Sequence, residues 1–232
     1  MRNEINPPLS EAQEDYLKQI LLLGGEAAGP VGTRDLATRL GVRPASVTGM
    51  VQRLAGLGLV EHRRYKGVRL TDAGRRIALE MIRHHRLLET YLQQALGYGW
   101  DEVHDEAERL EHAISERFEA RIAEALGHPT HDPHGDPIPR PDLSMPATPT
   151  AARLADMKDG HGGRLVRVGT QDPDALALLA RLELVPGVSL RAVGRAAAGV
   201  RVELSDGTRY LVPNDVARLL WIECEVEPEE DA

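Results

Sequence analysis

The sequence predicts a mainly α-helical N-terminal part, a winged helix-turn-helix followed by a helical dimerisation domain, and then a small all-β barrel. Three observations support this prediction. Apolar residues recur at steps of three and four over residues 11–126, a proline-rich stretch follows, and short alternating segments separated by glycines complete the chain. A chain of 232 residues is long enough for two domains with cores of their own.

The composition is that of a folded protein. Hydrophobic residues make up 42% of the chain and charged residues 28%, which excludes a disordered or collagen-like chain. Because no signal-like or membrane-spanning apolar run occurs, we expect a cytoplasmic protein without a membrane partner. The single cysteine, Cys224, excludes an internal disulfide and a thiolate zinc cluster. Any bound metal must therefore be held by histidines and carboxylates.

The first three expected helices have the arrangement of a DNA-binding unit. A capping-box pattern at Ser10 predicts a helix over residues 11–23. Thr33 can cap a short second helix, and Pro44 suits the first turn of a third. Two short helices joined by a turn containing Gly41 are typical of a helix-turn-helix, whose second helix lies in the major groove of DNA.

A basic hairpin is expected after these helices. Residues 59–63 and 68–70 have the pattern of two strands, and their connection completes a winged helix. Between Thr33 and Arg76, ten basic residues oppose three acidic ones, so this window has a net charge of 10 − 3 = +7 in a chain of net charge −8. Short helices bounded by glycines also occur in other small domains, but the local positive charge favours phosphate contact. The residues expected at DNA are Arg34, Arg43, Ser46, Thr48, Gly49, Gln52, Arg53, Arg63, Arg64 and Lys66.

Two long helices are expected next, over residues 72–95 and 101–126, with a break at the glycines near Tyr98. Their broad apolar faces suit dimerisation, and a twofold protein would match a palindromic operator. The expected division is a winged helix (1–71), a helical dimerisation and metal-binding domain (72–140), a proline-rich linker (141–149), a barrel (150–226) and an acidic tail (227–232). In the barrel, strands are expected at 164–168, 188–193, 200–204 and 209–212, with a helix over 173–182 capped by Asp172.

Histidines and carboxylates recur at helical spacing in the two long helices. His104, Glu108 and His112 are four residues apart, with Glu111 beside them, and His85 and Glu89 have the same spacing. A single pair of this kind is most often a solvated face. Several pairs on neighbouring helices can instead converge on a divalent transition metal.

These residues resemble the diphtheria-toxin-repressor family of iron- and manganese-dependent regulators over roughly residues 9 to 140. The remainder is similar to the optional C-terminal domain of that family, an SH3-like barrel of the FeoA type. Residues Leu154–Gly160 resemble the segment with which that domain begins. The segments that carry the resemblance are Glu14–Leu17, the winged-helix window, His85–Glu89, Val103–His112 and Pro133–Pro139.

The resemblance implies two metal sites. One would be formed by His85, Glu89 and His104, and the other by Asp15, Glu108, Glu111 and His112. Gln171 or Asp174 would add a ligand from the barrel to the first site.

The choice of metal follows from the donors. Iron-responsive members of the family have Met and Cys where this chain has Asp15 and Glu108, and manganese-responsive members have carboxylates there. The resemblance therefore implies Mn²⁺, with Fe²⁺ as the alternative. Lys18 departs from the family, because manganese members with coupled sites have a glutamate at that position.

The sequence thus predicts a metal-dependent transcriptional repressor, not an enzyme, that binds double-stranded operator DNA as a homodimer. Two alternatives stay open at this point. A metallohydrolase is disfavoured because the chain has no His-Glu-x-x-His motif and no obvious nucleophile constellation. The second alternative is a winged-helix regulator that senses an organic ligand. In that case the His and Glu residues of the long helices would be ordinary surface residues without a metal.

Overall fold

The computed structural model describes residues 8–25, 29–63, 66–147 and 149–224. The chain forms two compact units. The first comprises residues 1–85, 111–114 and 139–144, and the second comprises residues 86–110, 115–138 and 145–232. The predicted acidic tail, residues 227–232, lies outside the described residues.

Three helices begin the first unit: α1 (Glu11–Gly24), α2 (Thr33–Arg39) and α3 (Pro44–Gly56). The capping box is confirmed, because the backbone N–H of Ser10 donates to Gln13 Oε1 over 2.9 Å. Pro44 begins α3 as expected, whereas Gly32, and not Thr33, is the N-cap of α2. The apolar stripes of these helices meet in one core, in which Leu17, Leu36 and Leu54 are fully buried.

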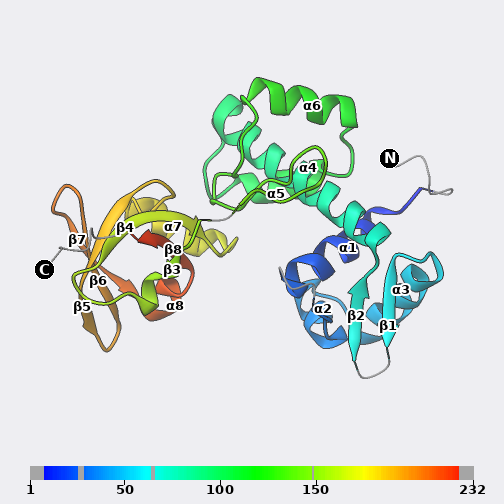
Figure 1. Cartoon of the computed structure of the whole chain (residues 1–232), viewed down its shortest axis with the longest axis horizontal. Helices are drawn as coiled ribbons and strands as arrows, with labels where there is room; N and C mark the ends of the chain where they lie inside the picture. Colours follow the sequence, from blue (N-terminus) through cyan, green and yellow to red (C-terminus); the bar gives the residue numbers. More distant parts are fainter. Residues whose placement is uncertain (1–7, 26–28, 64–65, 148, 225–232) are drawn as a thin grey trace, which may run out of the picture. The chain divides into compact units, whose positions relative to one another are not determined.

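The wing follows α3 as two antiparallel strands, β1 (Val60–Arg63) and β2 (Gly67–Leu70), shown beside α3 in Figure 1. Val31 forms a bridge to Val68 and so links the hairpin to the segment before α2. Gly67 has a φ of +90°, and a Cβ there would lie 2.6 Å from the carbonyl oxygen of Val31. Glycine is therefore required where the wing passes this segment.

The helical part contains three helices: α4 (Asp72–Leu96), α5 (Val103–Leu110) and α6 (Glu116–Ala125). The prediction of one helix over residues 101–126 is wrong. The chain leaves the helix after Leu110, and Ser115 caps the start of α6 by accepting a hydrogen bond from the backbone N–H of Phe118 over 3.3 Å. Glu111 is fully buried at this break, where its carboxylate contacts Lys18 of α1 and His85 of α4. These contacts stabilise the interruption between α5 and α6.

The C-terminal part is an antiparallel sheet of six strands in the order β3-β8-β4-β5-β6-β7. Its four predicted strands are confirmed as β4, β5, β6 and β7, and Asp172 caps α7 by accepting from the backbone N–H of Ala175 over 2.9 Å. The two strands that the sequence analysis missed, β3 and β8, pair with each other. The elements are β3 (Ala152–Arg153), η2 (Leu154–Asp156), β4 (Gly162–Val168), α7 (Pro173–Arg181), β5 (Ser189–Ala196), β6 (Gly199–Leu204), β7 (Arg209–Pro213), α8 (Asn214–Ala217) and β8 (Leu220–Cys224).

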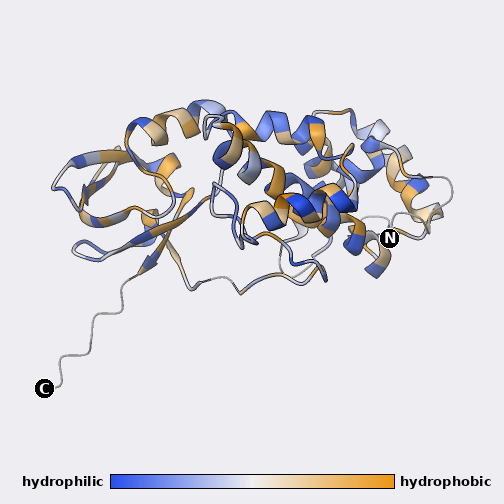
Figure 2. Ribbon diagram, turned by 90° about the horizontal axis from the view of Figure 1, so that it is seen from above, coloured by the Kyte–Doolittle hydropathy of each residue, from blue (hydrophilic) through white to orange (hydrophobic). Residues whose placement is uncertain are grey.

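The hydropathy of the ribbon alternates along the helices and strands of both units (Figure 2), as expected for elements that bury one face. In the barrel the buried side chains of Leu165, Val202 and Ile222 belong to one core that also contains Trp100. Among the described residues, no helix combines the length and apolar character needed to cross a membrane.

Candidate metal centre and nucleic-acid interface

Three groups of histidine and carboxylate side chains lie close enough together to hold a cation among the described residues. Within each group the ligand atoms lie within 4.8 Å of one another. The groups are named here by one member each: the Asp15 group (Asp15, Glu111, His112), the His104 group (His85, His104, Glu108) and the Glu89 group (Glu89, Asp132, His134).

The Asp15 group joins α1 to the break after α5. The Nδ1 atom of His112 lies 2.8 Å from Glu14 Oε2, and its Nε2 atom lies 3.0 Å from Asp15 Oδ1. Because both carboxylates only accept hydrogen bonds when ionised, both ring nitrogens must donate, which requires the imidazolium form. Burial acts to lower the pKa of His112, but the hydrogen bonds to Asp15 and Glu14 and the charge of Glu111 outweigh it and raise this pKa to about 10.

Lys18 already provides a cation beside this group. Its Nζ atom lies 2.5 Å from Glu111 Oε1, and the side chains are 3% and 0% exposed. The other carboxylate oxygen of Glu111 accepts a hydrogen bond from Nδ1 of His85 over 2.6 Å. Glu111 therefore contacts Lys18 with one carboxylate oxygen and His85, a member of the neighbouring His104 group, with the other.

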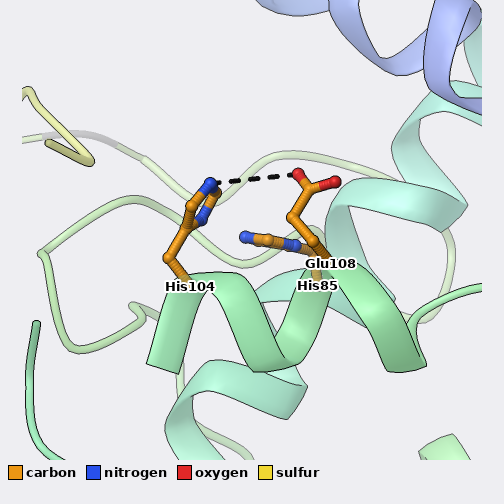
Figure 3. Close-up of side chains that lie close together, drawn as sticks. All are labelled: His85, His104 and Glu108. Carbon is orange, nitrogen blue, oxygen red and sulfur yellow. Dashed lines mark ion pairs between the residues drawn. The ribbon is translucent and has the colours of Figure 1, made fainter. Parts of the chain in front are cut away.

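The His104 group is drawn in Figure 3, where His104 and Glu108 project from one turn of α5 beside His85 of α4. The His104 Nε2 and Glu108 Oε1 atoms lie 3.9 Å apart, and His104 Nδ1 lies 3.2 Å from Glu89 Oε1. Since Nδ1 of His85 donates to Glu111, Nε2 is the atom of that ring suited to a metal. Glu108, which was expected beside Asp15, is thus grouped with the histidines of the other predicted site.

The Glu89 group was not predicted. Although they lie among prolines, His134 is 1% exposed and Asp132 is 7% exposed. Oδ1 of Asp132 accepts from the backbone N–H groups of His134 and Asp136, each over 2.9 Å, and this turn folds the segment back into the protein. Burial, with the charges of Glu89 and Asp136, raises the pKa of Asp132 to about 8.

The side chains expected at DNA lie on the surface of the first unit. All of them within the described residues are exposed, and Arg64 lies outside those residues. The exposed members are on α2 (Arg34), before or along α3 (Arg43, Ser46, Thr48, Gly49, Gln52, Arg53) and at the hairpin (Arg63, Lys66). The guanidinium of Arg63 lies 3.8 Å from the carboxylate of Glu61, and both side chains are more than half exposed.

Sequence reasoning missed several residues at these groups. Glu14 adjoins the predicted ligand Asp15, and nothing in the sequence pattern indicated that it would meet His112. The motif containing His134 was noted only as part of a family resemblance. Of the predicted barrel ligands, Gln171 lies two residues before α7 and Asp174 lies in its first turn; Asp174 is exposed and belongs to none of the three groups.

Comparison with known protein families matches almost the whole chain. Residues 8–68 match the iron-dependent repressor N-terminal DNA-binding domain, and residues 71–140 match the iron-dependent repressor metal-binding and dimerisation domain. Residues 152–224 match the FeoA domain.

Characterised relatives and solved structures agree with these matches. The chain is 30% identical to the iron-dependent repressor IdeR of Mycobacterium tuberculosis (strain ATCC 25618 / H37Rv) over 226 residues, which is 93% of this chain and 98% of the relative. A solved structure described as a manganese-dependent transcriptional repressor in complex with manganese has 42% identity and a TM-score of 0.84, covering 92% of this chain and 100% of that one. The structure of the manganese regulator SloR has 31% identity and a TM-score of 0.72, with coverages of 92% and 98%.

Proposed function

Because the chain belongs to the iron- and manganese-dependent repressor family typified by the diphtheria toxin repressor and IdeR, we propose that it is a manganese-responsive repressor. In this proposal it binds double-stranded operator DNA as a homodimer in the cytoplasm. The observation that carries the proposal is the Asp15 group, where donors from α1 and from the break after α5 converge within 4.8 Å.

The donor chemistry supports manganese. The Asp15 and His104 groups contain only imidazole nitrogens and carboxylate oxygens, which suit Mn²⁺ and Fe²⁺. The one cysteine, Cys224, belongs to β8 at the end of the barrel and offers no soft sulfur to either group. In the proposal Asp15, Glu111 and His112 hold one ion, and His85, His104 and Glu108, with Glu89 next to His104, hold another.

The ion in the Asp15 group would supply a divalent positive charge that no side chain can provide. To accept it, His112 must lose its proton, and Glu111 must share its carboxylate between Lys18 and the ion. These changes would fix α1, which packs in the core of the winged helix, to the chain segment after α5. A preference of the ion for this fixed state is the only means by which it can favour DNA binding.

The interface with DNA would be the exposed face of α3 together with the wing. Ser46, Thr48 and Gln52 are exposed along α3 and have the side chains needed to read base edges. Arg63 and Lys66 extend from the hairpin, where they suit phosphates. Replacing both by alanine should weaken binding to all DNA sequences and reduce the salt slope by about one unit for each lost phosphate contact. The exposed Lys158 of the barrel provides a control, because its replacement should leave the slope unchanged.

The central test is a titration of DNA binding with Mn²⁺, Fe²⁺ and Zn²⁺. Duplexes would first be selected from a random library by the manganese-loaded protein, and binding would be followed by fluorescence anisotropy. We expect tight binding with Mn²⁺ and its loss on chelation. Binding that persists after exhaustive chelation would instead favour a regulator of another ligand class, and metal-dependent ester hydrolysis without DNA binding would favour a hydrolase.

A further inference from the structure

We propose that the outer face of the C-terminal sheet is a second DNA-binding surface, which binds phosphate groups of the duplex without reading its sequence. The inference rests on the proposed function only for the identity of the anion as DNA. In the described part of the barrel, six arginines project from this face, and they come from five of its strands (Figure 1). The arginine face is named after them and comprises Arg153, Arg164, Arg167, Arg191, Arg201 and Arg209.

The register of β3, β8 and β4 places three of these arginines on one side of the sheet. Directly paired residues of antiparallel strands point to the same side, and so do alternate residues of one strand. Arg153 and Arg167 are both paired with Trp221. Arg164 is paired with Glu223, two residues further along β8 than Trp221. A bulge in β4 lets Arg164 and Arg167, which are three residues apart, share this side.

The other three arginines belong to the same side. Arg191 lies two residues after the partner of Arg164 in β5. It is paired with Glu203 of β6, which is paired in turn with Arg209 of β7. Arg201 lies two residues before Glu203 on β6. The opposite side of these strands carries the apolar side chains of the barrel core, so the arginine face is the outer one.

Charge is segregated between this face and the rest of the barrel. Among the described residues of its strands, the face has six arginines and two acids, Glu203 and Glu223, a net charge of 6 − 2 = +4. Residues 150–224 contain ten basic and nine acidic residues, a net charge of 10 − 9 = +1, so the remainder of the barrel carries 1 − 4 = −3. A positive face on a chain of net charge −8 indicates a polyanionic partner.

Trp221 holds two of these arginines in position. The guanidinium carbons of Arg153 and Arg167 lie 5.0 and 4.7 Å from the centre of its ring. Stacking on an aromatic ring fixes the plane of a guanidinium group and leaves its edge for hydrogen bonds to an anion. Arg153 is exposed, so its edge can meet a phosphate, whereas Arg167 is half-buried beside Asp136, 3.8 Å away. A side chain already held in place loses less entropy when it binds.

The extent of the face favours duplex DNA over a small anion. One phosphate ion needs one or two guanidinium groups, but the arginines here recur across strands that are about 4.8 Å apart. A duplex presents one negative charge for about every 1.7 Å of its axis, so several arginines can be engaged at once. The winged helix of the proposed function would bring the barrel of the same chain to the duplex at a high local concentration. Weak contacts of the arginine face would then add to the affinity.

The test measures how the DNA affinity of the full chain depends on salt. Arg153→Gln combined with Arg191→Gln removes two exposed charges of the arginine face. In anisotropy titrations of the manganese-loaded protein on the selected duplexes, the slope of log affinity against log salt should fall by about one unit for each lost phosphate contact, hence by about two units per protomer. The same fall is expected on a duplex of arbitrary sequence, because phosphate contacts carry no sequence information.

A matched control removes the same charge from another part of the barrel. Arg181→Gln combined with Arg218→Gln changes two exposed arginines, at the end of α7 and just after α8, and should keep the wild-type slope. Arg153→Lys combined with Arg191→Lys keeps both charges of the face and should also keep the slope, which separates a loss of charge from a loss of structure.

Equal slopes for the two glutamine pairs would overturn the proposal and would leave the arginine face to a protein partner. A slope that falls as much in the lysine pair as in the glutamine pair of the face would overturn it too, because the effect would then be structural. If the slopes differ as expected but Mn²⁺ does not stimulate binding to the selected duplexes, the proposed function fails and the arginine face stands. A Mn²⁺ response with equal slopes has the opposite meaning.

Discussion

In the Asp15 group a lysine contacts a buried carboxylate at hydrogen-bond distance, whereas in the Glu89 group the guanidinium of Arg86 lies 3.5 Å from Asp132. Lys18 lies 2.5 Å from Glu111, and His112 donates to carboxylates from both ring nitrogens. In the Glu89 group Arg86 faces Asp132 at 3.5 Å, while Nδ1 of His134 has no hydrogen-bond partner among the described residues. Buried carboxylates need compensation in both places: in the Asp15 group it comes from side-chain cations at hydrogen-bond distance, and for Asp132 it comes from two backbone N–H groups at 2.9 Å.

This difference indicates how a metal would act at the Asp15 group of the proposed function. At the Asp15 group an ion has to compete with an ammonium group and a proton, so binding there changes an existing network. This behaviour suits a reversible sensor.

The largest expected effect comes from removing the internal cation. Lys18→Met leaves the buried Glu111 without its ammonium partner, and breaking a buried pair in this way costs about 3–5 kcal/mol of unfolding free energy. We expect this loss in chelator and its partial recovery in Mn²⁺, because the ion then compensates Glu111. Urea denaturation with and without Mn²⁺ measures both quantities.

The matched control for that experiment is Lys158→Met, because Lys158 is exposed on the barrel. It should unfold like the wild type under both conditions. If Lys18→Met is as stable as the wild type in chelator, the ammonium of Lys18 does not compensate Glu111, and the contrast between the two groups disappears.

The next effect concerns coupling to DNA. Asp15→Ala removes the one ligand of its group that α1 supplies, so Mn²⁺ should no longer favour the DNA-binding state. We expect the loss of a stimulation of about 5–150-fold, the usual range of an allosteric coupling. Anisotropy titrations on the selected duplexes measure it, with Glu11→Ala, an exposed acid of the same helix, as the control. A full Mn²⁺ response in Asp15→Ala would show that this group is not the sensor.

For a change of one pH unit, the effect of pH is the smallest of the three. Because the folded-state pKa of His112 is raised from 6.5 to about 10, its contribution to the stability of the metal-free protein is fully present below about pH 6.5. This contribution is lost as pH rises through 10. The same proton must leave when Mn²⁺ binds, so Mn²⁺ affinity should rise with pH by up to about tenfold per unit over this range.

Calorimetry in buffers of different ionisation enthalpy counts the released protons. We expect about one proton from the Asp15 group, and His112→Gln should abolish it together with binding at that group. His128→Gln changes an exposed histidine and should leave the count unchanged. A proton count near zero in the wild type would mean that His112 is neutral before the metal arrives.

The sequence by itself determined the elements whose signal is local. Steps of three and four place Leu17 and Leu54 on buried helix faces, and alternation marks four strands of the barrel, because side-chain direction repeats with a period set by each element alone. The types of metal donor were also evident, since the i, i+4 spacing of His104 and Glu108 puts both on one face of a helix. The assignment of particular donors to particular sites remains a prediction.

Only the tertiary structure decided how donors from different elements are grouped. The helix expected over residues 101–126 is interrupted at Glu111. The carboxylate of Glu111 instead forms hydrogen bonds with Lys18 and His85, which are 93 and 26 residues away in the sequence. His134 is buried because Asp132 turns its segment back, so that His134 Nε2 lies 3.1 Å from the backbone carbonyl oxygen of Trp100. The periodicity of apolar residues shows which face of a single helix or strand is buried. Contacts between distant residues depend on how the elements pack, and that information is not carried by the pattern of any single segment.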